Sequence, residues 1–162
     1  VRLAFAGSNE QPYQSVGRWL LDRGLIKDAS WQGIKAWIVS TQASNPRLVQ
    51  EMLWSNPRYV FFREEVRSAA DADLGPRGAQ GVPLTAGRSI AVDKDSIPYG
   101  TPVWLASAGP NGNLQRLVFA QDTGSAITGA VRADYFAGTG AEAGEFAGRM
   151  KQGLRLWVLW PK

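Results

Sequence analysis

Residues 114–134, LQRLVFAQDTGSAITGAVRAD, divide into three parts with different patterns. Residues 114–122 are rich in apolar and β-forming side chains and predict a strand that ends at Asp122. The residues that follow are small, apolar or glycine, and the run closes at Asp134. This order predicts a β-rich domain with acidic groups at its strand ends, because a strand that ends in a carboxylate is followed by an open loop and a second carboxylate.

Strand-like segments with turn signals between them recur through the second half of the chain. The stretch GPNGN at 109–113 is a hairpin signal of the Asn-Gly type. A polar, glycine-containing connection is expected at 68–81 and one helix at 140–151. Several short strands of this kind predict a small barrel or sandwich. The other expected strands are 58–64, 82–92, 100–107 and 154–160.

The first part of the chain has helical periodicity after an opening strand. Three helices are expected within 11–25, 30–40 and 44–56. The expected start and stop residues are Pro12 in a first turn, Gly24 as a stop, Ser30 and Asn45 as N-caps, and Pro46 at a first helical position. The residues expected to face inward are Val16, Trp19, Leu20, Leu25, Trp31, Ile34, Trp37, Ile38, Leu48, Val49, Met52 and Leu53.

The change of period after residue 57 is the clearest boundary in the sequence. We expect an opening strand and helical segment over 1–57, associated with the β-rich part over 58–162. The opening residues VRLAFAGSNE are apolar from the start and include no initiator Met. They are typical of a strand from a longer protein, which predicts an N-terminal portion that precedes this sequence.

Composition restricts the chemistry that this chain can perform. The chain has 162 residues, of which 44% are hydrophobic and 20% charged, as in a globular domain. It has no Cys and no His, which excludes thiol nucleophiles, Ser-His-Asp triads, disulfides and most zinc sites within it. Asp, Glu, Lys, Tyr or Ser must therefore supply any catalytic group, and no metal or cofactor is expected.

Charge, tryptophan content and hydropathy give weaker indications. The net charge of +4 comes from scattered Lys and Arg without a basic run, so no nucleic-acid partner is expected. The seven Trp residues suit either a core or a sugar-binding groove, and in the helical half we expect core. No stretch is long enough to span a membrane, and the start resembles no export leader.

Three aspartates stand at expected strand ends, where they could converge on one face: Asp93, Asp122 and Asp134. Each has a structural interpretation, because Asp before a turn accepts backbone N–H bonds. The functional interpretation is a general acid. An Asp, with an ordinary pKa of about 3.9, holds a proton near neutral pH only beside another negative charge or an apolar surface. Asp122 and Asp134 could form such a pair, which is typical of glycosidic bond cleavage.

Several longer motifs carry a resemblance. The stretches LAFAGSNEQPYQSVGRWLLDRG (3–24), SIAVDKDSIPYGTPVWL (89–105) and FAQDTGSAITGAVRADYFAGTGAEAGEFAGRMKQGLRLWVLWP (119–161) resemble the MltA family of lytic transglycosylases. The last includes its C-terminal "3D" region, named for three aspartates. The departures are Ser125, where many members have Gly, and Ala137, where many have Trp.

The resemblance implies a fold that is mainly β with some α. It is a double-psi β-barrel over 58–162, completed by the N-terminal portion, with helical segments beside it. A barrel whose remaining strands lie elsewhere leaves exposed edges, so we expect the chain to need that portion. The implied activity is cleavage of the β-1,4 bond between N-acetylmuramic acid and N-acetylglucosamine in peptidoglycan, which leaves 1,6-anhydromuramoyl ends. The implied acid/base is Asp134, with Asp122 and Asp93 nearby.

Residues near these motifs are candidates for substrate contacts. The candidates are Asn9, Tyr13, Ser15, Lys94, Tyr99, Thr123, Gly124 and Ser125. The structural alternative is a helix-entry turn for the first three and a solvated loop for Lys94 and Tyr99. Around Asp122, small residues leave the backbone open to a bulky ligand.

Two other functions stay open on the residues alone. One is a binding module without catalysis, as in expansins, and the other is a hydrolase in which Asp122 activates water. The partners implied by the resemblance are peptidoglycan glycan strands and the N-terminal portion of the same protein. The implied location is the periplasm of Gram-negative bacteria, attached to the outer membrane through an N-terminal lipid anchor.

Overall fold

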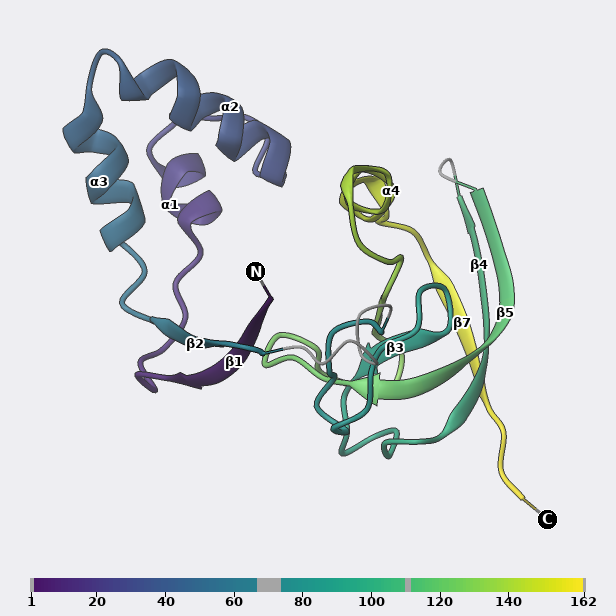
Figure 1. Cartoon of the computed structure of the whole chain (residues 1–162). Coiled ribbons are helices and arrows are strands. Elements are labelled where there is room, and N and C mark those ends of the chain that lie inside the picture. The colour runs from purple at the N-terminus through teal and green to yellow at the C-terminus, as the bar shows by residue number, and fades with distance from the viewer. Residues whose placement is uncertain (1, 67–73, 110–111, 162) are drawn as a thin grey trace. The chain divides into compact units, whose positions relative to one another are not determined.

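The computed structural model describes residues 2–66, 74–109 and 112–161. Its contacts form two compact units, one over Leu3–Glu65 and the other over Val66–Lys162 together with Arg2 (Figure 1). The boundary predicted from the sequence lies after residue 57. The difference concerns the strand β2, Val60–Glu64, which belongs to the first unit.

In the first unit, β2 pairs with β1, Leu3–Ser8, as an antiparallel ribbon. The register runs from Leu3 opposite Glu64 to Ser8 opposite Val60, with an irregularity between Phe5 and Gly7. The strand expected at 58–64 is therefore confirmed, but its partner is the opening strand. Residues far apart in sequence pair here, and periodicity alone cannot indicate which strand is the partner.

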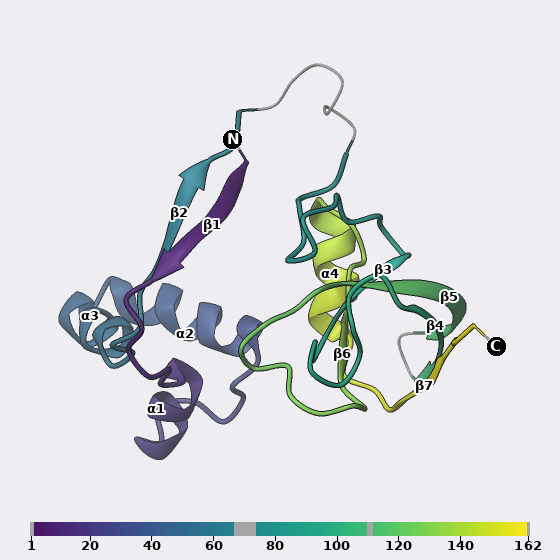
Figure 2. The ribbon, with the colours of Figure 1, turned by 90° about the horizontal axis from the view of Figure 1, so that it is seen from below.

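Three helices complete the first unit: α1 (Val16–Asp22), α2 (Trp31–Gln42) and α3 (Pro46–Trp54) (Figure 2). Ser30 and Asn45 are N-caps as expected, accepting hydrogen bonds from Gly33 N and Leu48 N at 3.1 Å. Gly24 follows α1 with φ +67°, a conformation that suits glycine at a helix stop. The expectation for Pro12 was wrong, because α1 begins at Val16 and its N-cap is Ser15.

The helices share a small core of Leu20, Ile34, Val49 and Met52, all buried. Trp19 and Trp37 pack against it in part. The expectation of an inward Leu53 was wrong, since its side chain is 54% exposed, and Trp31 and Trp54 are also exposed. The reason is geometric: successive helical residues differ by about 100°, so a short helix that buries Met52 turns Leu53 aside.

The second unit is built on a mixed five-stranded sheet with the strand order β6-β3-β5-β4-β7. These strands are β3 (Ser89–Val92), β4 (Pro102–Gly109), β5 (Gly112–Asp122), β6 (Ala133–Tyr135) and β7 (Leu154–Val158). β3 runs parallel to β5, and the other pairs are antiparallel. The mainly β fold with helices that the sequence predicts is confirmed, and it is consistent with the expected double-psi β-barrel.

The expected hairpin is present, because β4 and β5 pair from Pro102 opposite Phe119 to Gly109 opposite Gly112. Residues 110–111 of the GPNGN signal, and 67–73 of the expected connection, lie outside the described residues. The strand expected at 82–92 is shorter than predicted. A turn precedes it, in which Arg88 N donates to Thr85 O and Gly87 has φ +74°, so β3 starts at Ser89.

The core of the second unit lies on one face of this sheet. Its centre is formed by side chains that alternate along the strands: Ile90, Val92, Val103, Leu105, Val118 and Ala120. The helix α4, Ala141–Arg149, buries none of its own residues fully, although Phe146 packs against this core. A Cβ placed on Gly144 would meet no neighbour, so close packing does not explain that glycine. No helix in the described ranges has the length and hydropathy of a membrane span.

Candidate active site

The pairing of three strands brings two of the predicted aspartates to the same residue. On one side of β3, Ala91 is paired with Asp122 of β5, and on the other side Ala91 is paired with Asp134 of β6. Neighbouring strands lie about 4.8 Å apart, so the two aspartates stand roughly 10 Å apart at the backbone. The expected strand end at Asp134 needs correction, because this residue is the middle one of β6.

Asp122 and Asp134 line one cavity of about 450 Å³. Its wall includes Ala91 and the loop residues 123–127 that follow Asp122. The described residues form no hydrogen bond between the two carboxylates. Asp122 is held by another segment, since its Oδ1 accepts a hydrogen bond of 2.9 Å from Ala79 N. The side chain thus has both a structural contact and a place in the cavity wall.

Asp93 has a different setting. Its Oδ2 accepts from Gly129 N at 2.7 Å and its Oδ1 from Asp95 N at 3.1 Å. These N–H groups, Gly129 foremost, hold the pKa of Asp93 below its ordinary value, because they stabilise the carboxylate form. Asp93 therefore fixes the glycine-rich loop by its charge, as the structural interpretation predicted, and it is not among the residues that line the cavity with Asp122.

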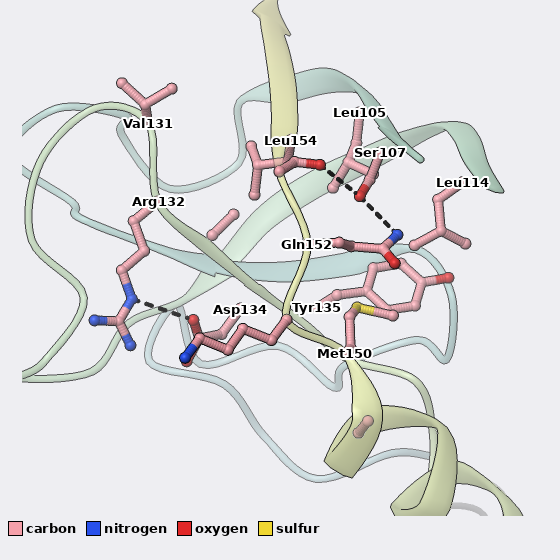
Figure 3. A pocket seen from close by; sticks show the side chains of 14 residues that line it. Leu105, Ser107, Leu114, Val131, Arg132, Asp134, Tyr135, Met150, Gln152 and Leu154 are labelled. Carbon is pink, nitrogen blue, oxygen red and sulfur yellow. Dashed lines mark hydrogen bonds and ion pairs between the residues drawn. The ribbon is translucent and has the colours of Figure 1, made fainter. Parts of the chain in front are cut away.

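A second, larger cavity of about 690 Å³ lies beside Asp134 (Figure 3). The side chains in its wall include Leu105, Leu114, Arg132, Asp134 and Lys151. Asp134 belongs to the walls of both cavities and its side chain is 57% exposed. This position leaves the carboxyl accessible to a large polar ligand.

Arg132 is the residue at this site that sequence reasoning missed. Its Nε lies 3.4 Å from Asp134 Oδ1, and its Nη1 donates to Ala126 O (Figure 3 shows the ion pair). The sequence spacing could have indicated it, because Arg132 stands two residues before Asp134, directly ahead of β6, and alternate residues of an extended chain share a face. One side chain thus links the carboxyl of Asp134 to the loop.

The candidate contacts close to the aspartates have the following settings. Thr123 donates its hydroxyl to Val92 O at 2.7 Å, and Gly124 O accepts from Ile127 N at 2.9 Å. Ser125 is exposed. Lys94 is paired with Asp95 at 2.7 Å, and this partner raises the pKa of Lys94. Tyr99 is half-buried.

Asn9, Tyr13 and Ser15 lie in the first unit. Asn9 ties the β1–β2 ribbon together, donating to Pro57 O and accepting from Tyr59 N at 2.9 Å each. Ser15 caps α1, accepting from Arg18 N at 3.2 Å. Tyr13 is exposed. The contact of Ser15 is that of a helix-entry turn, whereas the contacts of Asn9 join two chain segments that are distant in sequence.

Within the described residues, no group of three or more Asp and Glu side chains is placed to hold a metal ion. This arrangement can support acid and base chemistry at Asp134. The other charged residues in the two cavity walls are Arg132, Lys151 and Asp122.

Comparison with known proteins gives two family matches that together extend over most of the chain. The MltA specific insert domain matches residues 1–63, and the 3D domain matches residues 88–160. The first match ends within β2, close to the division between the two compact units. The family matches therefore agree with the organisation of the fold.

Individual relatives point the same way. Membrane-bound lytic murein transglycosylase A of Escherichia coli K12 is 36% identical over 96% of this chain, which spans 42% of that relative's length. The crystal structure of MltA from Neisseria gonorrhoeae is 45% identical, with a TM-score of 0.83 over 99% of this chain and 40% of its own.

The structure of E. coli MltA with bound chitohexaose is 32% identical, with a TM-score of 0.80 over 96% of this chain and 46% of its own. The chain thus spans less than half the length of these relatives. With both domains matched in order and the fold shared, the chain belongs to the MltA family.

Proposed function

We propose that the protein is a lytic transglycosylase that cleaves the β-1,4 bond between N-acetylmuramic acid and N-acetylglucosamine in peptidoglycan. The observation that carries this proposal is the pairing of both Asp122 and Asp134 with Ala91, in the wall of one cavity. The named activity of the E. coli relative and the oligosaccharide in the E. coli MltA structure support a glycan as the substrate.

The proposed reaction uses Asp134 twice. As an acid it protonates the glycosidic oxygen, the bond from that oxygen to C1 breaks, and N-acetylglucosamine leaves with the proton. As a base, the resulting carboxylate removes the proton from the C6 hydroxyl of the muramoyl residue, and O6 bonds to C1. Asp134 regains its proton and no water is consumed. Attack within one sugar also has a high effective molarity.

In this proposal Asp122 acts by its charge. A carboxylate in the same cavity wall favours the protonated form of Asp134 before the reaction and stabilises the oxocarbenium-like cation during it. Asp93 contributes through the loop that it binds at Gly129. The small residues between Asp122 and Gly129 leave room for a sugar ring against the backbone.

Mass spectrometry of digested peptidoglycan tests the proposal. The intact protein should release muropeptides with anhydro ends, which weigh one water less than the products of hydrolysis. Products with reducing muramic acid ends would instead indicate a hydrolase, and binding without soluble products would indicate an expansin-like module. Either result would contradict the proposal.

We also propose that the protein acts in the periplasm, attached to the outer membrane, with peptidoglycan glycan strands as its partner. The name of the E. coli relative, which describes it as membrane-bound, supports this location. Fractionation of cells with an antibody against the protein should recover it with outer membranes. Recovery in the cytoplasmic fraction would contradict the proposed location.

A further inference from the structure

Asp134 has a cationic neighbour, Arg132, in the residue directly before the strand β6. The guanidinium of Arg132 contacts Oδ1 of Asp134 through Nε and the carbonyl of Ala126 through Nη1. Two contacts in different directions fix the planar group more firmly than one, because rotation of the side chain breaks at least one of them. Arg132 therefore sets the position of the carboxyl relative to the loop.

We infer that Arg132 is a positioning residue for proton transfer by Asp134, which rests on the proposed function. Arg132 occupies Oδ1 and leaves Oδ2 as the oxygen that gives and takes the proton. When Asp134 donates its proton, a negative charge appears on the carboxyl beside the guanidinium. An interaction that strengthens as charge develops lowers the barrier of that step.

The other charged and titratable groups around Asp134 oppose or add to this effect. Asp122 is in the wall of the smaller cavity and Lys151 in that of the larger one. Tyr135 follows Asp134 on β6 and lines both cavities. Asp93 accepts a hydrogen bond from Gly129 N and lines neither of the two cavities. Among the described residues, Arg132 makes the only ion pair with Asp134, and it thus has the most direct effect on this carboxyl.

Kinetics of four variants of the intact protein test the inference. Arg132→Gln should lower kcat by about twofold to fivefold, the range that a half-exposed ion pair can supply. KM should change by less than about twofold, because the guanidinium contacts the acid and not the sugar. The alkaline limb of the kcat–pH profile should move to higher pH, because the variant lacks the cation beside the acid.

Arg132→Lys keeps the cation but cannot make both contacts. It should return the alkaline limb to its original pH while restoring kcat only in part. Arg155→Gln is the matched control and should leave both quantities unchanged, because Arg155 lies over Trp157 on β7, the edge strand opposite β6 in the strand order. Asp93→Asn, which loosens the same loop at Gly129, should not move the alkaline limb.

The outcomes separate the inference from the proposed function. If the unaltered protein forms no anhydro ends, the proposed function is wrong. If it forms them, and Arg132→Gln keeps the same kcat and pH profile with an unchanged melting temperature, the inference is wrong. A second contrary result is a loss of rate in Arg132→Gln with no shift of the kcat–pH profile and no difference from Arg132→Lys. Arg132 would then only anchor the loop, and this result would also overturn the inference.

Discussion

Asp122 and Asp134 are both paired with Ala91, one on each side of β3. Neither carboxylate reaches the other through a hydrogen bond within the described residues, and each has its own partner, Ala79 N for Asp122 and Arg132 for Asp134. The two residues thus share a cavity wall while keeping separate contacts. This separation allows their roles to be tested one at a time.

Replacement of the proposed acid should abolish most of the activity. Asp134→Asn cannot carry the transferable proton, so release of anhydro-muropeptides should fall by about a thousandfold. The readout is mass spectrometry of digested peptidoglycan. Asp22→Asn, at an exposed residue of α1 paired with Arg18, is the matched control and should keep full activity. Wild-type product release by Asp134→Asn would remove Asp134 from the mechanism.

Two substitutions at Asp122 distinguish its charge from its contact with Ala79. Asp122→Asn keeps an oxygen that can accept the Ala79 N–H bond and loses only the charge, so kcat should fall about tenfold to a hundredfold with little change in melting temperature. Asp122→Ala also loses the acceptor and should melt at a lower temperature. Steady-state kinetics and thermal unfolding measure the two effects. Equal activity of Asp122→Asn and the unaltered protein would exclude the electrostatic role.

Asp93 should make stability depend on pH. Its pKa is lower in the folded state than in the unfolded chain, because Gly129 N and Asp95 N stabilise the carboxylate. The stabilisation is therefore present above the unfolded value of about 3.9 and is lost as the pH falls through the folded value.

Denaturant unfolding of Asp93→Asn beside the unaltered protein measures this dependence. Asp93→Asn should be the less stable at pH 7, and the difference should shrink as the pH falls below about 3.9 and through the folded pKa of Asp93, because the carboxyl is then protonated in both states. A difference that stays the same size throughout this acid range would show that the charge of Asp93 does not contribute to stability.

Two leucines of the helical unit differ in exposure and form a matched pair for measurements of stability. Leu20→Ala removes a fully buried side chain and should lower the free energy of unfolding by about 2–5 kcal/mol. Leu53→Ala removes an exposed one and should change it by about 0.5 kcal/mol or less. Denaturant unfolding of both variants measures the difference, and equal losses would contradict the orientation of α3.

The sequence alone predicted the features that depend on near neighbours. The N-caps Ser30 and Asn45 and the stop at Gly24 follow from hydrogen bonds and backbone angles within a few residues, and the structure confirms them. The β4–β5 hairpin also followed from its turn signal. The family motifs indicated which aspartates to consider, and the family itself is confirmed by the comparisons.

Tertiary structure alone decided which strands pair and in what register. The parallel pairing of β3 with β5 places Asp122 beside Ala91, the pairing with β6 places Asp134 on the other side, and β2 pairs with β1. These contacts join residues distant in sequence, so their selection depends on the burial of whole faces and not on local propensity. For the same physical reason the sequence did not indicate the role of Arg132, because its contact with Ala126 exists only once the loop has folded back on β6.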